Sequence, residues 1–314
     1  MSFDNPLLMM NAMVFTFLFT ATIISRGLRM RHADGVENAV ITNLNQRVNA
    51  WWVMALIVGS SFWIGTYAVV GLFGLASFMA LREFFTLTNT RRGDHWALLS
   101  SFFLILPLQF ALVALGKYGL FTLLIPVWAF LALPVIAALR GDTSSFFERV
   151  SKVQWGLMIC VFALSHVPAL LMLDIPGFTS GNVLLVAFLI FVVQMSDVLQ
   201  YVWGKLLGKH KIAPNVSPSK TWEGLIGGAL SATLIGAGLF WITPFTPLQA
   251  AGMAFMICVM GFLGGLVMSA IKRDLDVKDW GDTINGHGGF VDRLDSIFFA
   301  APVFFHVTRY FWAG

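Results

Sequence analysis

Long apolar runs constrain the fold of this chain more than any other feature. Runs near the length of about 20 residues that crosses a bilayer fall at about 7–25, 96–115, 119–139, 153–173, 183–203, 223–243, 249–271 and 296–312. Another run, at about 50–85, is too long for one crossing, and Trp63 to Thr66 offers a break within it. Only 11% of the residues are charged, against about 25% in soluble domains. The pattern predicts an all-α polytopic membrane protein with about ten transmembrane helices.

The basic residues predict the orientation of these helices. With ten crossings, one side of the membrane receives the loops at about 26–49, 86–95, 140–152, 204–222 and 272–295. Together with the span ends beside them, these loops hold all of the 20 basic residues except Lys117 and Arg309. Because Lys and Arg concentrate in cytoplasmic loops, we expect both termini outside and the five loops in the cytoplasm. A multi-pass protein of the cell inner membrane, with its active-site loops on the cytoplasmic face, is the resulting prediction.

The chain reads as a single membrane domain over residues 1–314. No repeat of 20–50 residues and no low-complexity linker divides it. Residues 1–182 form hydrophobic N-terminal helices, whereas charge and glycine concentrate in 183–314, where the chemistry is expected. The net charge of +4 is modest and does not indicate binding to nucleic acid. Cys160 and Cys258 lie inside apolar runs with no second ligand at metal-binding spacing, so we expect them to be packing residues.

The first polar feature of the C-terminal part is Asp197, inside the predicted span 183–203. A carboxylate at membrane depth is costly and is a functional-site candidate by default. Ser196, Gln200 and Tyr201 supply further polar groups within about one helical turn. The alternative is that Asp197 lies close enough to the interface to be solvated.

The second feature is the segment SPSKTWEG, which precedes the span at 223–243. Its donors, Ser217, Ser219, Lys220 and Thr221, stand where a helix begins, and a helix N-terminus favours phosphate. Ser and Thr are equally good N-caps, so capping remains the alternative. The nearby basic residues, among them Lys205 and Lys209, can be explained as positive-inside anchors. The glycines at 224, 227 and 228 allow helices to approach closely.

The third feature is the segment 269–295, which holds six Asp, two Lys and two Arg beside His287 and four glycines. Asp292 and Asp295 are three residues apart and would share a helix face. Two such carboxylates suit a hard cation that also binds substrate phosphates. Lys272 and Arg273 can hold phosphate oxygens, the first as a point charge and the second as a planar fork.

These segments together resemble the phosphatidate cytidylyltransferase (CDP-diacylglycerol synthase) family. The resemblance lies in the pattern S-x-x-K-R, then K-D, then H-G-G-x-x-D-R-x-D in the segment 269–295. It extends to S-P-x-K-T-x-E-G at 217–224 and to the pair Asp197 and Tyr201. The match covers roughly residues 190–300.

The resemblance implies transfer of CMP from CTP to phosphatidic acid or a related lipid phosphate within membrane lipids, with release of pyrophosphate. It implies Mg²⁺ as cofactor, with room for a second cation, and a homodimer is compatible with it. The implied catalytic residues are Ser269, Lys272, Arg273, Asp292 and Arg293. The implied substrate-binding residues are Tyr201, Ser217, Ser219, Lys220, Thr221, Lys278, Asp279, His287, Gly288 and Gly289. The candidate metal ligands are Asp197, Asp292 and Asp295.

Two departures from the family pattern keep an alternative open. Asn285 replaces the usual Pro or Gly, and Gly265 stands where the family typically carries a metal-binding Asp. Many members also have Glu at the position of Met268. The alternative is a divergent paralogue that binds nucleotide or lipid without turnover, as a regulator or partner subunit. A transporter has less support, because no inverted repeat or pair of broken helices is visible.

Overall fold

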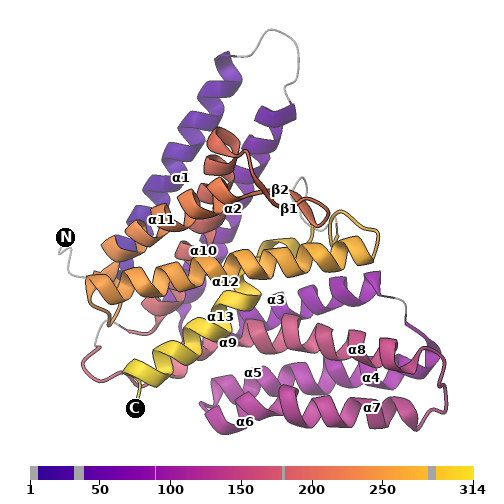
Figure 1. Ribbon diagram of the computed structural model, residues 1–314. Coiled ribbons are helices and arrows are strands. Elements are labelled where there is room, and N and C mark those ends of the chain that lie inside the picture. Colours follow the sequence, from indigo (N-terminus) through magenta and orange to yellow (C-terminus); the bar gives the residue numbers. More distant parts are fainter. Residues whose placement is uncertain (1–5, 32–38, 89, 179–180, 282–287) are drawn as a thin grey trace.

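The computed structural model describes residues 6–31, 39–88, 90–178, 181–281 and 288–314 of the chain (Figure 1). Within these ranges the protein is built almost entirely of helices, and it is an all-α polytopic membrane protein. Seven of the described helical segments are long and apolar enough to cross a membrane. The number of crossings and the side of each loop remain predictions.

The helices of the N-terminal part lie below and beside the helices of the C-terminal part (Figure 1). Its elements are α1 (Pro6–Arg31), α2 (Ala39–Ile64), α3 (Thr66–Leu87), η1 (Arg92–Asp94), α4 (His95–Ser100), η2 (Ser101–Ile105), α5 (Leu106–Ala114), α6 (Tyr118–Leu123), η3 (Leu124–Ala129), α7 (Phe130–Ala138), α8 (Phe146–Gly156), η4 (Leu157–Ala163), α9 (Leu164–Ala169) and η5 (Leu170–Met172). The predicted break in the long run is confirmed, because α2 ends at Ile64 and α3 begins at Thr66. Between them Gly65 has φ 122°, a conformation that side chains other than hydrogen disfavour.

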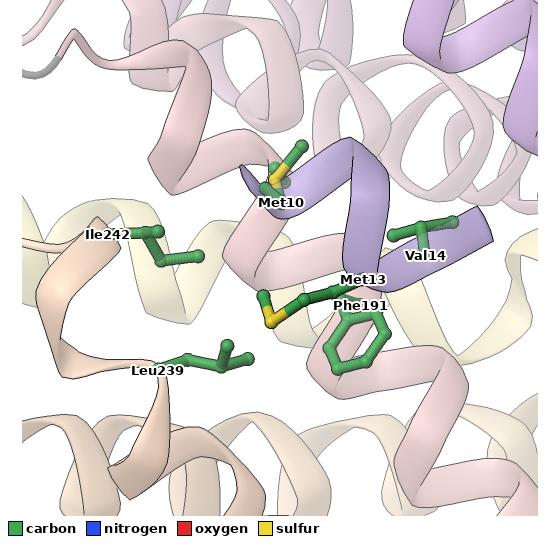
Figure 2. A pocket seen from close by; sticks show the side chains of 7 residues that line it. Met10, Met13, Val14, Phe191, Leu239 and Ile242 are labelled. Atoms are coloured by element: carbon green, nitrogen blue, oxygen red, sulfur yellow. The ribbon is translucent and has the colours of Figure 1, made fainter. Parts of the chain in front are cut away.

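The helices α1 and α2 lie side by side and project from the rest of the bundle (Figure 1). The N-terminal end of α1 contacts the rest of the bundle through apolar side chains. Met10 and Met13 face Phe191 and the turn that carries Leu239, as Figure 2 shows. Over most of its length α1 exposes apolar side chains, as a helix in contact with lipid does.

The C-terminal part contains four long helices and one small hairpin. Its elements are α10 (Val183–Leu207), β1 (Lys211–Ala213), β2 (Ser217–Thr221), α11 (Trp222–Gly238), η6 (Phe240–Ile242), α12 (Pro247–Asp274) and α13 (Val291–Trp312). The two strands pair antiparallel, with Lys211 opposite Thr221. This hairpin is the one β-sheet formed by the described residues, and its strand β2 holds the SPSKT segment against α10, α11 and α12.

Glycines set the spacing between these helices, as the sequence predicts. A Cβ atom added at Gly228 would lie 2.6 Å from the backbone nitrogen of Gln200, and one at Gly227 would lie 2.6 Å from Cγ of Trp203. Only a glycine face on α11 therefore allows the observed contact with α10. On α12, Gly264 packs in the same way against α13, where an added Cβ would lie 2.6 Å from the carbonyl oxygen of Asp295.

Candidate active site

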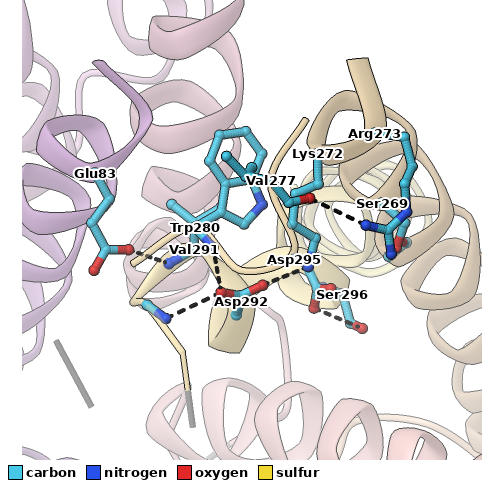
Figure 3. Close-up of polar contacts among 12 residues, drawn as sticks. Glu83, Ser269, Lys272, Arg273, Val277, Trp280, Val291, Asp292, Asp295 and Ser296 are labelled. Atoms are coloured by element: carbon cyan, nitrogen blue, oxygen red, sulfur yellow. Dashed lines mark hydrogen bonds and ion pairs between the residues drawn. The ribbon is translucent and has the colours of Figure 1, made fainter. Parts of the chain in front are cut away.

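Five of the charged residues singled out in the sequence lie where β2, α10, α12 and α13 come together, namely Asp197, Lys220, Lys272, Asp292 and Asp295. Figure 3 shows the part of this cluster that lies around Asp292. Two groups of charges can be distinguished. One surrounds Asp292 and the loop before α13, and the other surrounds Lys220, Asp197 and Asp295.

Asp292 organises the loop between α12 and α13. One carboxylate oxygen, Oδ1, lies 2.6 Å from Nζ of Lys272. The other, Oδ2, accepts hydrogen bonds from the backbone nitrogens of Trp280 at 2.8 Å and Gly289 at 3.1 Å. Gly288 has φ 76° and lies so close that an added Cβ would be 2.7 Å from Oδ2 of Asp292. Glycine at position 288 is therefore needed for the backbone to wrap the carboxylate of Asp292.

The side chains of Ser269 and Arg273 are tied to nearby backbone. The hydroxyl of Ser269 donates to the carbonyl of Gly265 at 2.6 Å, as expected for residues one helical turn apart. Arg273 donates to the carbonyls of Val216 and Val277, so it joins the end of α12 to the hairpin and to the loop. These two bonds use Nε and Nη1 of the guanidinium and do not involve Nη2.

The second group of charges is centred on Lys220. Its ammonium donates to the carbonyl of Phe262 at 3.3 Å and lies 4.6 Å from the centroid of that residue's ring. Burial lowers the pKa of Lys220, while the neighbouring carboxylates of Asp295 and Asp197 oppose that shift. Two carboxylates outweigh one ammonium, so this group as a whole attracts a cation, and Lys220 can act on a phosphate once such a cation offsets the carboxylates.

Asp197 and Asp295 converge on one hydroxyl. Oγ of Ser296 lies 3.1 Å from Oδ1 of Asp197 and 3.4 Å from Oδ1 of Asp295. Asp197 lies at the surface of α10 inside a candidate membrane span, and Asp295 is half-buried. Nearby on α10, Gln200 donates to Ser196 at 2.6 Å and packs against Gly228 of α11, whereas Asp197 reaches Ser296 of α13.

Gly265 faces this second group of charges. A Cβ atom at that position would lie 2.8 Å from Nζ of Lys220, 3.4 Å from Oδ2 of Asp295 and 3.8 Å from Oγ of Ser296. All three are side-chain atoms of the polar cluster. Gly261, one turn earlier, instead packs against Ser296 on α13. The two glycines of this GxxxG pair therefore have different surroundings.

The donor set fits a magnesium ion that is completed by substrate phosphates. Within the described part of the chain, no group of three His, Cys, Asp or Glu side chains could hold a metal ion by itself. Mg²⁺ commonly binds one or two carboxylates together with substrate phosphates and water, and Asp197 with Asp295 offers such a pair. Asp292 is engaged by Lys272 and by backbone N–H groups, and its part as a ligand stays a prediction.

The remaining predicted residues divide into structural and exposed positions. Thr221 caps α11, since its hydroxyl accepts the backbone N–H of Gly224 at 3.2 Å; the capping alternative is thus confirmed for this residue. Glu223 accepts the backbone N–H groups of Lys209 and His210. Ser219, Lys278, Asp279 and Tyr201 are exposed, Arg293 is half-buried and Ser217 is buried. His287 and Asn285 lie outside the described residues.

The sequence did not single out Ser296, which joins Asp197 and Asp295, or Glu83 on α3. The side chain of Glu83 is only 7% exposed, and Oε2 accepts the backbone N–H of Val291 at 3.0 Å. Added Cβ atoms at Gly281 and Gly289 would lie 3.0 Å and 2.3 Å from its carboxylate oxygens. The next residue, Phe84, stacks on Trp280 at 5.3 Å between ring centroids. Two residues of α3 therefore hold the loop between α12 and α13: Phe84 contacts Trp280 before α13, and Glu83 binds Val291 at the start of α13. Figure 3 shows Glu83 beside Val291.

Comparison with known proteins shows the family to which the chain belongs. A model of the cytidylyltransferase family matches residues 45–311. The chain is 39% identical to "uncharacterized protein YnbB" of Escherichia coli (strain K12), over 95% of this chain and 97% of that protein. It is 34% identical to a phosphatidate cytidylyltransferase of Staphylococcus aureus (strain COL), over 50% of this chain and 62% of that protein. It is also 41% identical to the phosphatidate cytidylyltransferase of Mycobacterium leprae (strain TN), over 53% of this chain and 52% of that protein.

Proposed function

We propose that this chain, which belongs to the cytidylyltransferase family, transfers CMP from CTP to phosphatidic acid and forms CDP-diacylglycerol and pyrophosphate. The observation that carries the proposal is that Lys220 and Asp295 lie on either side of the Gly265 position, while Lys272 pairs with Asp292 on the same helix as Asp295. The relatives named phosphatidate cytidylyltransferase support the choice of reaction, although the chain spans only about half to two thirds of their length.

The reaction needs charge neutralisation more than proton transfer. An anionic oxygen of the lipid phosphate attacks the α-phosphorus of CTP, and the bond between the α-phosphorus and the bridging oxygen breaks. The electron pair of that bond leaves on pyrophosphate. Because the nucleophile is already an anion, no general base is required, and catalysis rests on positioning and electrostatic stabilisation.

The basic side chains of the site would meet the phosphates. Lys220, held between α10 and α12, is placed to contact the phosphate that reacts, and Arg273 offers the edge of its guanidinium from the end of α12. Lys272 is paired with Asp292, so its first task is to position the loop that Asp292 holds. When bound at Asp197 and Asp295, magnesium would supply further positive charge to the phosphate oxygens.

We propose that the site faces the cytoplasm from the cell inner membrane. This side follows from the bias of basic residues, and it would allow soluble CTP to meet a lipid that stays in the bilayer.

The test is pyrophosphate release by the purified full chain. CTP, phosphatidic acid and Mg²⁺ together should release pyrophosphate and yield CDP-diacylglycerol in equal amounts, and omission of the lipid should abolish both. Replacement of CTP by ATP should sharply reduce turnover. Binding of CTP or lipid without pyrophosphate release would instead favour the non-catalytic paralogue, and equal turnover with ATP would contradict the choice of nucleotide.

A further inference from the structure

A second cationic pocket lies away from the residues of the candidate active site. It has a volume of about 500 Å³ and lies between the start of α4 and the end of α7. Its lining includes Thr90, Arg91, Arg92, His95, Trp96 and Arg140. None of these residues belongs to the segments 217–224 and 269–295, which carry the resemblance to the family.

The acidic residues near this pocket are already engaged. Arg149 is buried, and its Nη1 lies 3.1 Å from Asp94 and 3.2 Å from Asp142. Its Nη2 donates to the carbonyl of Asp142 at 2.6 Å. Arg149 thereby pairs with both carboxylates, which lie in the same loops as the pocket residues.

The arginines of the pocket form no close ion pair of this kind, and Arg91 lies within electrostatic range of Asp142. Within the described residues, the side chains of Arg91, Arg92 and Arg140 form no ion pair. All three are exposed. The guanidinium carbon of Arg140 lies 5.1 Å from the ring centroid of Trp96, within the range of a cation–π contact, which does not use the N–H groups as hydrogen-bond donors. Three unpaired guanidinium groups around one pocket favour a phosphate.

The surroundings of the pocket favour a phosphate that is attached to a lipid. Trp96 is 47% exposed and stands at the end of an apolar helical segment, where tryptophan lies in the interface of a bilayer. Leu139, which precedes Arg140, is 82% exposed, and Leu99, one turn after Trp96, is exposed as well. An apolar surface thus continues from the pocket along α4 and α7, as acyl chains would require.

We propose that this pocket binds the phosphate headgroup of an anionic phospholipid, as a site distinct from the one at which CMP transfer is proposed. Basic pockets between transmembrane helices are known to bind such headgroups. The pocket residues Thr90, Arg91 and Arg92 come shortly after α3 in the chain. Because Glu83 of α3 binds the start of α13, the pocket lies at the same end of the bundle as the loop between α12 and α13 (Figure 1).

Phosphatidylglycerol is the suitable probe, because the phosphate acceptor of the proposed reaction is a different lipid. The delipidated full chain is titrated with phosphatidylglycerol or phosphatidylcholine, and the retained lipid is counted by native mass spectrometry. The double variant R91Q/R92Q should bind phosphatidylglycerol about 10- to 30-fold more weakly than wild type, with phosphatidylcholine unchanged. The variant R140Q alone should also weaken it, and R140K should restore part of the affinity.

The matched control is K205Q/K209Q, which removes the same charge from another basic loop. Its affinity for phosphatidylglycerol should equal that of wild type. Equal binding by R91Q/R92Q, R140Q and wild type would overturn the proposal, as would an equal loss in K205Q/K209Q, which would mean diffuse attraction. Competition arms with inorganic phosphate and glycerol 3-phosphate separate the sources: displacement of the lipid at equal affinity would assign the pocket to soluble phosphates instead.

Discussion

The substitution Gly265→Asp tests the second group of charges directly. The new carboxylate would stand beside the ammonium of Lys220 and the carboxylate of Asp295, since a Cβ atom at position 265 lies 2.8 Å and 3.4 Å from their nearest atoms. The short approach is to the flexible end of a lysine side chain, which can move by a few tenths of an ångström. No backbone atom of another helix is among the three nearest atoms.

The electrostatic cost of this substitution is small because two large terms oppose each other. At about 4 Å and an effective dielectric constant of about 20, attraction to Lys220 and repulsion from Asp295 are each about 4 kcal/mol. Replacement of glycine within a helix returns a few tenths of a kcal/mol. We therefore expect the free energy of unfolding to change by no more than about 1 kcal/mol without added cation.

Magnesium should then stabilise the variant more than it stabilises wild type. The variant would offer carboxylates at 197, 265 and 295, and a ligand present at about 100 times its Kd adds about 2.7 kcal/mol to the stability of the folded state. Thermal melts of both proteins with and without Mg²⁺ measure this difference, and pyrophosphate release should rise in parallel.

The neighbouring glycine provides the control. At Gly264 an added Cβ would lie 2.6 Å from the backbone of Asp295 and 3.1 Å from Phe299, so Gly264→Asp should unfold or destabilise the protein by about 3 kcal/mol or more. Similar destabilisation by Gly265→Asp would identify Gly265 as a packing residue. A folded Gly265→Asp variant without extra stabilisation by Mg²⁺ would refute a cation position beside Asp295.

Three further predictions concern single residues. Lys220→Ala should lower turnover about 100-fold while the protein still folds; because burial lowers the pKa of Lys220, wild type should lose activity as the pH rises, at a pH below the ordinary lysine value, and Lys220→Arg should keep it. Unchanged turnover in Lys220→Ala would show that the lysine is only a topological anchor. Glu83→Gln should cost about 1 kcal/mol in thermal stability, because the hydrogen bond of Val291 loses a charged acceptor, and should reduce turnover; a silent variant would rule out a positioning role. A cysteine at position 210 should resist an impermeant reagent in intact cells, and ready labelling would contradict the predicted orientation.

The helices could be predicted from sequence because the signal for them is local. A run of about 20 apolar residues is recognised without knowledge of its neighbours, and the break at Gly65 was visible in the same way. The residues of the polar cluster at 197, 217–221 and 269–295 could also be named, since polar groups at the ends of apolar runs stand out against their surroundings. Their partners could not be named, because those lie far away in the chain.

Tertiary structure alone decided which residues meet. Glu83 looks like an ordinary charge near the end of a helix, yet its carboxylate receives the backbone N–H of Val291, 208 residues later. The two glycines of the GxxxG pair on α12 are equivalent in sequence, but Gly261 packs against α13 whereas Gly265 faces Lys220. The side of a helix that a residue presents to a neighbour depends on how the other helices pack, and a sequence pattern with a period of 3.6 residues does not specify that packing.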